Sequence, residues 1–297
     1  MIDPLSPNPY ESSNVHIFGA RGHRWKRIRT ITSSTLNTTK LRQMLPLILE
    51  EMDDFIVYLL KQNVYYSDSE IDVHSLFQQL TASVIGRCAL GLEKNAFENP
   101  PKHFKYFKQV FGPEPTISMD FQTFQWIIPM TTKFLSLITD IIWKSSKNPI
   151  DKLNDFITKL LSKKIKRKNA ADILQNLKEF ETFDNCYLQT AKMDYNNILN
   201  LDNSKKAEKL HTNEIISTIR FLSIAGFDTT ANTLSFACFL LAENPEKLEK
   251  VFEEIDSLSK SDDKLDYDIL SEAIYINAVL LETLRLFPHA SMYIFII

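Results

Sequence analysis

The chain has 297 residues, and 44% of them are hydrophobic, which is enough for one large buried core or two ordinary ones. Lys and Arg number 34 against 37 for Asp and Glu, so the net charge of -3 produces no overall field that would favour nucleic acid or an acidic substrate. The three cysteines have the spacing of neither a disulfide framework nor a CxxC metal site, which favours a reducing compartment. We interpret Cys88, Cys186 and Cys238 as thiols of the core.

The opening segment, MIDPLSPNPYESSN, is polar and rich in turn-forming residues, so it predicts neither a signal peptide nor a membrane span. The longest apolar stretch near the middle, residues 126–143, contains Pro129, Lys133 and Asp140, and these interruptions argue against a transmembrane helix. A peripheral contact with a membrane stays open at this point.

Apolar residues at helical spacing predict several helices in the first half of the chain. A short basic helix follows Gly22, and Thr38 or Thr39 is expected to cap a second helix that bends slightly at Pro46. Further helices are expected over residues 73–90, ending near Gly91, then over 100–110 and over 150–168, where a basic run ends the helix as the macrodipole favours.

Residues 169–211 are polar and predict loops with at most one or two short helices. A long apolar helix follows, which we expect Thr212 or Asn213 to cap and which runs to about Glu243. Because this helix is apolar nearly all round, it is expected to be the central, buried element.

Two more helices complete the chain. Asn244 and Pro245 begin one of them in the preferred N-cap and N1 arrangement, and Pro288 stops a last helix over residues 271–287. Strand signals are few, so the predicted fold class is mainly α with little β structure.

The centre of the long helix carries a polar segment, SIAGFDTTANT, from Ser223 to Thr233. Its glycine, Gly226, is the only one after Gly112 and costs about 1 kcal/mol relative to alanine. Asp228 is expected to be partly buried and to have a partner, because an unpaired buried carboxylate is expensive. Two interpretations follow: the glycine lets a flat cofactor lie against the backbone beside groups that pass protons, or the helix is kinked around an internal water.

Two other pairs share a helix face. Trp25 and Arg29 are four apart, which indicates either an aromatic anchor on an exposed basic helix or a patch for a membrane or nucleic acid. Glu282 and Arg285, in ETLR, form the only Glu-x-x-Arg of the chain, and by themselves they predict a solvated ion pair.

AGFDTT, from Ala225 to Thr230, resembles the oxygen-activation motif of the cytochromes P450, the haem-thiolate monooxygenases. WKRIR and ETLRLFP resemble two other motifs of that family and stand in the expected order, and the context of WKRIR is similar to the animal microsomal branch. The resemblance implies an incomplete cytochrome P450 fold with a long central helix, forming a single domain over residues 1–297. It is faintest from about Gly112 to His211.

The site residues that the resemblance implies are Asp228 and Thr229 as catalytic residues, and Trp25, Arg29, Ala225 and Gly226 as cofactor-binding residues. Thr229 would hydrogen-bond the bound dioxygen, and Asp228 would supply protons for cleavage of the oxygen–oxygen bond. Ala225 and Gly226 would border the haem. Trp25 and Arg29 would contact a haem propionate, for which arginine is well suited.

The same resemblance implies a haem-dependent monooxygenase that inserts one oxygen atom of O₂ into a small apolar organic substrate. NADPH would supply electrons through a flavoprotein reductase. The implied location is the endoplasmic reticulum membrane, on its cytosolic face, with the membrane surface as a partner and no nucleic acid.

The family's haem-ligating cysteine lies in a Phe-x-x-Gly-x-Arg-x-Cys-x-Gly loop, and none of the three cysteines here has the glycine two residues on. No metal ligand is therefore assigned, and His23 and His289 are expected to have surface or packing roles. We expect the domain to lack the N-terminal anchor region and the haem-cysteine loop, and the chain as given to be inactive. The alternative function is a non-catalytic helical fragment that binds a partner or has no function.

Overall fold

The computed structural model describes residues 15–61, 71–94, 97, 99–111, 149–162, 172–182, 209–259 and 266–289. The expectations for the apolar stretch 126–143, for the end of the helix over 163–168 and for Cys186 lie outside these residues. Within them the structure is mainly α, as the apolar spacing predicts.

The elements in chain order are α1 (Gly22–Ser34), α2 (Thr38–Lys61), α3 (Val73–Cys88), α4 (Lys102–Phe111), α7 (Pro149–Ser162), α8 (Ile173–Lys178), β1 (Glu181–Thr182), β2 (Leu210–His211), α10 (Thr212–Glu243), α11 (Pro245–Ser259), α12 (Tyr267–Ser271) and α13 (Ile274–Leu286). The expected last helix, over residues 271–287, is α13, which begins at Ile274 and is preceded by the short helix α12. Pro46 lies inside α2, which continues through it.

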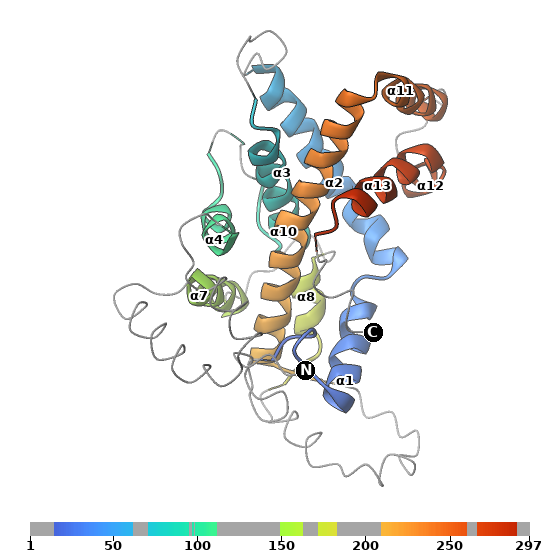
Figure 1. Ribbon diagram of the computed structural model, residues 1–297. Coiled ribbons are helices and arrows are strands. Elements are labelled where there is room, and N and C mark those ends of the chain that lie inside the picture. The colour runs from blue at the N-terminus through green and yellow to red at the C-terminus, as the bar shows by residue number, and fades with distance from the viewer. Residues whose placement is uncertain are drawn as a thin grey trace, which may run out of the picture.

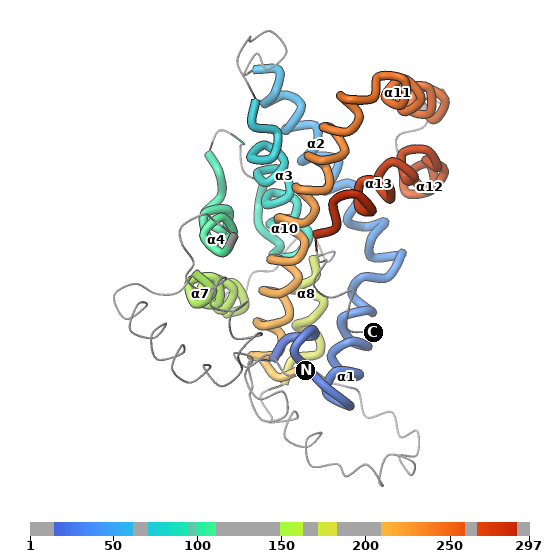
Figure 2. The backbone as a smooth tube through the Cα atoms, viewed as in Figure 1, coloured from blue at the N-terminus to red at the C-terminus, as the bar shows by residue number. Residues whose placement is uncertain are grey.

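Helix α10 is the central element, and its 32 residues span about 48 Å at the usual rise of 1.5 Å per residue. Its most extensive packing is against α3, and α13, α7, α8, α11 and α4 also contact it. Figure 1 shows α4 and α7 on one side of α10 and α11, α12 and α13 near its C-terminal end, and the tube in Figure 2 follows the same path. Helix α10 is therefore the element on which six of the other described helices pack.

The main core lies around the N-terminal half of α10, where apolar side chains of α3, α4, α7 and α8 meet it. Phe227 of α10 is fully buried, and its ring centroid is 5.2 Å from that of Phe107 on α4. Leu153 and Ile157 bring one face of α7 into the same cluster, and both are fully buried. This core holds the first half of α10 in place.

The burial of α10 differs from the expectation of a helix buried all round. The run from Glu214 to Ile219 is buried, whereas Phe239 near the other end is 52% exposed. Cys238 is also exposed, so its interpretation as a core thiol was wrong, while Cys88 is buried as expected. The apolar composition of a helix does not by itself say which of its turns has neighbours.

In the part of the chain that the structure describes, α10 is the one helix long and apolar enough to cross a membrane by length and composition. Core helices of soluble proteins pass the same test. Its packing against α3, α7 and α13 buries some of its apolar residues, while others, such as Phe239, stay exposed.

The described β structure is a two-stranded parallel sheet of two residues in each strand, in which Glu181 pairs with Leu210 and Thr182 with His211. The amide of Leu210 also donates to the carbonyl of Phe180 at 2.8 Å. This short ladder holds the chain before α10 beside the end of α8.

Two N-caps correct the expectations. His211 caps α10: its Nδ1 accepts from the amide of Asn213 at 3.1 Å, while the Glu214 carboxylate accepts from the amide of His211 at 3.0 Å. This reciprocal pair is a capping box built on an imidazole, a side chain that is not among the usual caps, so Thr212 and Asn213 were wrong.

Helix α2 likewise begins earlier than expected. Thr38 is already its first residue, so neither Thr38 nor Thr39 is its N-cap. Asn37 takes the capping position, and its Oδ1 accepts from the amide of Lys40 at 2.9 Å. In the same helix, the Arg42 guanidinium bonds to the Asp268 carboxylate of α12, with Nη1 2.7 Å from Oδ2, and lies 5.0 Å from the centre of the Tyr267 ring. This exposed pair links α2 to α12.

Candidate functional site

The polar segment of α10 presents two different sides. Ala225 and Thr229 are exposed and lie four residues apart, so they occupy one face, which Thr233 continues. The Thr229 hydroxyl donates to the carbonyl of Ala225, and the Thr233 hydroxyl donates to the carbonyl of Thr229 at 2.8 Å. Each hydroxyl proton is therefore held by the helix backbone, while the oxygen keeps a lone pair that can accept. We call these three residues the open face of α10.

Asp228 turns toward α3. Its Oδ1 accepts from Nε2 of Gln78 at 2.7 Å, and its Oδ2 accepts from Nδ2 of Asn232 at 3.0 Å. Nε2 of His74 lies 3.4 Å from Oδ1, and the Asp228 side chain is 19% exposed. The expectation of a partly buried carboxylate with partners is confirmed.

Asp228 and Thr229 are therefore adjacent in the chain but point in directions about 100° apart around the helix. The acid lies against α3 and the hydroxyl lies on the open face. The hydrogen bonds of Asp228 go to Gln78 and Asn232 and that of Thr229 goes to the Ala225 carbonyl, so a proton passed from one side chain to the other would need a bridging water or a change of rotamer.

Gly226 is also turned toward α3. A Cβ added to it would lie 3.6 Å from Cδ1 of Ile85, an ordinary van der Waals distance. The bare side of this glycine therefore belongs to the contact between α10 and α3 and not to the open face. Helix α10 runs unbroken from Thr212 to Glu243 through this position.

Helix α1 also has two sides. Trp25 is 45% exposed and Arg29 is exposed, so the pair that the sequence singled out lies together on the outer side. Arg24 and Arg27 are 2% and 8% exposed, on the inner side with Ile28. The basic residues of this helix are thus divided between solvent and the protein interior.

The inner arginines meet Glu214 in α10. Nε of Arg24 lies 2.8 Å from Oε1 of Glu214, and the Arg27 guanidinium donates to both carboxylate oxygens, at 2.8 Å and 3.1 Å. Arg27 also donates to the carbonyl of Lys209, just before α10. Sequence reasoning missed this cluster, because nothing in a basic helix tells which arginine will meet an acid 190 residues later.

Glu282 and Arg285 of α13 form the ion pair that their spacing predicts. The two side chains share two hydrogen bonds of 2.7 Å, and both are exposed. Beyond the end of α13, Phe287 stacks on Phe236 of α10 with a centroid distance of 4.2 Å and an interplanar angle of 2°.

The same segment brings His289 to the open face, where its Nε2 lies 2.8 Å from the Thr233 hydroxyl oxygen. Because that hydroxyl gives its proton to the carbonyl of Thr229, His289 acts as the donor. This is the packing role that the sequence favours for His289.

Cys88 is the described cysteine that lies in the core. Burial raises the pKa of the Cys88 thiol to about 12, so it stays protonated and is a poor ligand for a metal. The described part of the chain contains no group of three or more His, Cys, Asp or Glu side chains that could hold a metal ion.

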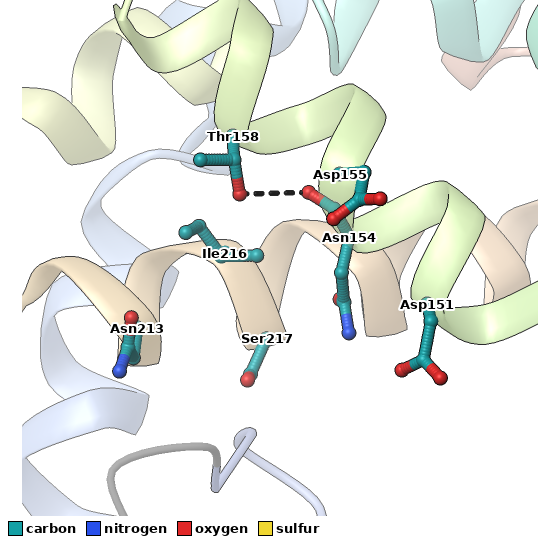
Figure 3. A pocket seen from close by; sticks show the side chains of 7 residues that line it. All are labelled: Asp151, Asn154, Asp155, Thr158, Asn213, Ile216 and Ser217. Carbon is teal, nitrogen blue, oxygen red and sulfur yellow. Dashed lines mark hydrogen bonds between the residues drawn. The ribbon is translucent and has the colours of Figure 1, made fainter. Parts of the chain in front are cut away.

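A polar hollow of about 510 Å³ lies between α7 and α10, away from the residues that the sequence predicted (Figure 3). Its lining consists of Asp151, Asn154, Asp155, Thr158, Asn213, Ile216 and Ser217. Oδ1 of Asn154 accepts from the Arg220 guanidinium at 3.0 Å, and the Asn154 carbonyl accepts from the Thr158 hydroxyl at 2.8 Å. A second hollow, of about 370 Å³ and mostly apolar, lies between the end of α10 and α13.

Comparison with known proteins decides the family. A family model described as Cytochrome P450 matches residues 4–295. The chain belongs to the cytochrome P450 family. Relatives from Caenorhabditis elegans include CYP13A2, 28% identical over 98% of this chain and 56% of its own length, and CYP13A6, 30% identical over 97% and 55%. A third, CYP13A10, is 29% identical over 98% and 56%. Each bears a name that assigns it provisionally to the cytochromes P450.

The chain thus spans about half the length of the curated relatives that it matches. The cytochrome P450 family is a family of haem-iron oxidoreductases of the monooxygenase type. The motif AGFDTT of this cytochrome P450 lies at the middle of α10, at the point where the helix passes from its buried half to its open half.

Proposed function

We propose that this chain forms part of a haem-dependent monooxygenase that inserts one oxygen atom of O₂ into a small apolar organic substrate. The observation that carries the proposal is the arrangement of the motif on α10, with Ala225 and Thr229 on an exposed face and Asp228, the residue before Thr229, hydrogen-bonded to Gln78 of α3. A helix end or a core contact would have no need of an exposed hydroxyl and a tethered acid side by side.

The donors present suit a haem group. Trp25 and Arg29 expose an indole N–H and a guanidinium on one side of α1, and both groups donate hydrogen bonds that a propionate can accept. Ala225 would border the ring through a small side chain, and Gly226 through its backbone. When bound, haem would supply the activation of O₂ with two electrons and two protons, one oxygen atom entering the substrate and the other leaving as water.

Thr229 is proposed to hold a proton at the open face. Its hydroxyl now donates to the Ala225 carbonyl, and rotation about the Cβ–Oγ1 bond would turn the proton outward, where substrate and dioxygen would meet. Asp228 is proposed to supply the replacement proton. His74, whose side chain is 41% exposed, lies 3.4 Å from its Oδ1 and offers a link to solvent.

Further parts of the proposal rest on family membership alone. NADPH would deliver electrons through a flavoprotein reductase, and no nucleic acid would take part. The location proposed is the cytosolic face of the endoplasmic reticulum membrane, with the membrane surface as a partner.

Titration of the purified chain with haemin tests the proposal. We expect a saturable Soret band, weakened roughly 10-fold to 100-fold in affinity by Arg29→Leu, because a charge-assisted hydrogen bond would be lost. Lys26→Leu is the matched control, since it removes an exposed charge from the same helix and leaves Trp25 and Arg29 in place. No saturable uptake, or equal losses in both variants, would contradict the assignment.

The competing function is a non-catalytic helical fragment that binds a partner. It is favoured by an exposed apolar stripe on α13, in which Ile274 is 77% exposed and Leu281 is 64% exposed. Tight haem uptake in the same titration would count against it, and the spectrum of the reduced sample under carbon monoxide would report whether a thiolate ligates the iron.

A further inference from the structure

The cluster of Arg24, Arg27 and Glu214 links the two helices that carry the proposed haem contacts. Arg24 and Arg27 belong to α1, as do Trp25 and Arg29, while Glu214 belongs to α10, which carries the motif. This inference rests on the proposed function, because it concerns the placement of residues toward haem.

The attachment of α1 to α10 combines charged and apolar contacts. Helix α1 meets α10 through Arg24 and Arg27, which are buried against Glu214. Its buried apolar contacts come from Ile28 and Ile31, which lie on the same inner side as the arginines. The strongest directional contacts between α1 and α10 are therefore the charged hydrogen bonds to Glu214.

The cluster fixes the rotation of α1 about its own axis. At about 100° per residue, the inner pair, Arg24 and Arg27, lies roughly 150° around the helix from the midpoint of Trp25 and Arg29. Because the Glu214 carboxylate binds both Arg24 and Arg27, α1 cannot rotate about its axis without breaking these bonds. The direction of Trp25 and Arg29 is fixed with it. Since Glu214 is fully buried and also accepts from the amide of the N-cap residue His211, it has little freedom to follow a rotating partner.

The cluster also fixes the side of α10 on which α1 lies. Ala225 follows Glu214 by eleven residues, close to three full turns, so the two lie within about 20° of each other around α10. Helix α1 is therefore held on the side of α10 that faces the same way as Ala225 and, one turn later, Thr229. The N-terminal part of that side is covered by α1, while Ala225 and Thr229 are exposed.

We propose that Glu214, through Arg24 and Arg27, is a positioning residue that sets α1 so that Trp25 and Arg29 address the same haem as the open face of α10. The motifs on the two helices supply the contacts to haem. The buried cluster of Arg24, Arg27 and Glu214 sets how the two helices are oriented relative to each other. Glu214 itself touches no reacting group in this assignment.

A double-mutant cycle on haemin affinity of the full chain tests the role. The variants are Glu214→Gln, Arg29→Leu and the double variant, with affinity measured from the Soret absorbance. If Glu214 acts through the direction of Arg29, each single variant weakens binding roughly tenfold, and the double variant is no weaker than the poorer single variant within about twofold. Multiplied losses in the double variant would overturn the role, because they describe two independent effects.

Ile157→Ala is the control for a general loss of stability. It removes buried volume from α7, so it should lower the melting temperature while leaving haemin affinity unchanged. If Glu214→Gln does not fold, Arg24→Met replaces it, because Glu214 then keeps its two bonds to Arg27. Multiplied losses of haemin affinity in a cycle of Arg24→Met and Arg29→Leu would also overturn the positioning role. A wild-type chain that takes up no haemin contradicts the proposed function and the positioning role together, whereas uptake with an uncoupled cycle contradicts the positioning role alone.

Discussion

Asp228 and Thr229 share a motif, yet they meet different surroundings and should respond differently to substitution. Gln78 is 7% exposed, and the hydrogen bond that its side-chain amide gives to Asp228 is the one that the structure assigns to it. Thr229 is exposed and bonds only to the backbone of its own helix. The stability of the chain should therefore depend on the acid and hardly at all on the hydroxyl.

Asp228→Leu is expected to lower the free energy of unfolding by about 1–3 kcal/mol, because the buried amide of Gln78 would lose its acceptor. Thr229→Val, at the next position, should change it by less than about 0.5 kcal/mol. Urea denaturation measures both. Adding Gln78→Leu to Asp228→Leu should restore part of the loss, and a further full loss would show that the amide does not depend on this carboxylate.

His103 is the residue for which a pH dependence of stability is clearest. Its Nε2 donates to the Ala82 carbonyl at 2.8 Å, and burial lowers the pKa of the imidazole from 6.5 to about 4. The unfolded chain therefore binds a proton between about pH 6.5 and pH 4 that the folded chain does not. Stability is complete above that range and falls as the pH falls through it.

The free energy of unfolding should fall by about 3 kcal/mol by pH 4 through His103 alone. Each pH unit between the pKa of the unfolded chain and that of the folded chain is worth about 1.36 kcal/mol. Thermal unfolding between pH 7 and pH 4.5 measures it. His103→Gln keeps a donor for Ala82 but does not titrate, so the difference between wild type and variant should shrink as the pH falls. His16, whose pKa burial and then Arg220 lower to about 4, titrates in both proteins and cancels.

At the scale of the elements, α13 shows how one helix can cap another. Its N-cap residue, Ala273, offers no side-chain acceptor, and the Glu254 carboxylate of α11 takes that place. It accepts from the amides of Tyr275 and Ile276, both at 2.8 Å. These bonds lower the pKa of Glu254, so the cap weakens in acid as the carboxylate is protonated.

Glu254→Ala should therefore speed hydrogen exchange of the Tyr275 and Ile276 amides severalfold, because the first turn of α13 would fray. Exchange followed by mass spectrometry on peptides from this region measures the effect. Glu253→Ala is the matched control. The Glu253 carboxylate is exposed, and the amides of Tyr275 and Ile276 donate to Glu254. Equal exchange in the two variants would mean that α13 holds its first turn without α11.

The helices follow from local residue pattern, which is why their positions were predicted well. Their ends depend on single contacts, and these were predicted less well: His211 and Asn37 cap helices for which threonines were expected. The strands β1 and β2 have two residues each, too few for an alternating pattern to be seen.

The site was predicted in a similarly uneven way. The residues of the motif on α10 could be found because glycine, aspartate and threonine oppose local helix preference together. The direction of each side chain could not, because it depends on α3: Ile85 faces Gly226 and Gln78 faces Asp228. The arginine cluster on Glu214 joins parts of the chain that only the fold brings together.

On the scale of the whole molecule, the apolar surface is concentrated around the C-terminal helices. Phe252 and Ile255 of α11 are 56% and 43% exposed, and they add to the stripe on α13. Apolar areas of this kind favour association with a partner surface or self-association.

Leu281→Gln together with Ile274→Gln should lower the binding of an apolar fluorescent dye and the tendency to self-associate, with little change in the unfolding midpoint, because both side chains are already exposed. Leu60→Gln on α2, where the wild-type leucine is 56% exposed, is the control for a single apolar residue elsewhere. An equal effect of the control would mean that the surface around α13 is not distinctive.

Two of the molecule's arginine ion pairs should respond differently to ionic strength. The pair of Arg42 and Asp268 is 48% and 65% exposed, so added salt screens it and loosens the hold of α12 on α2. Arg24 and Glu214 are almost completely enclosed, and mobile ions cannot come between them. In concentrated salt, therefore, the end of the molecule near α12 should become looser while α1 keeps its place on α10.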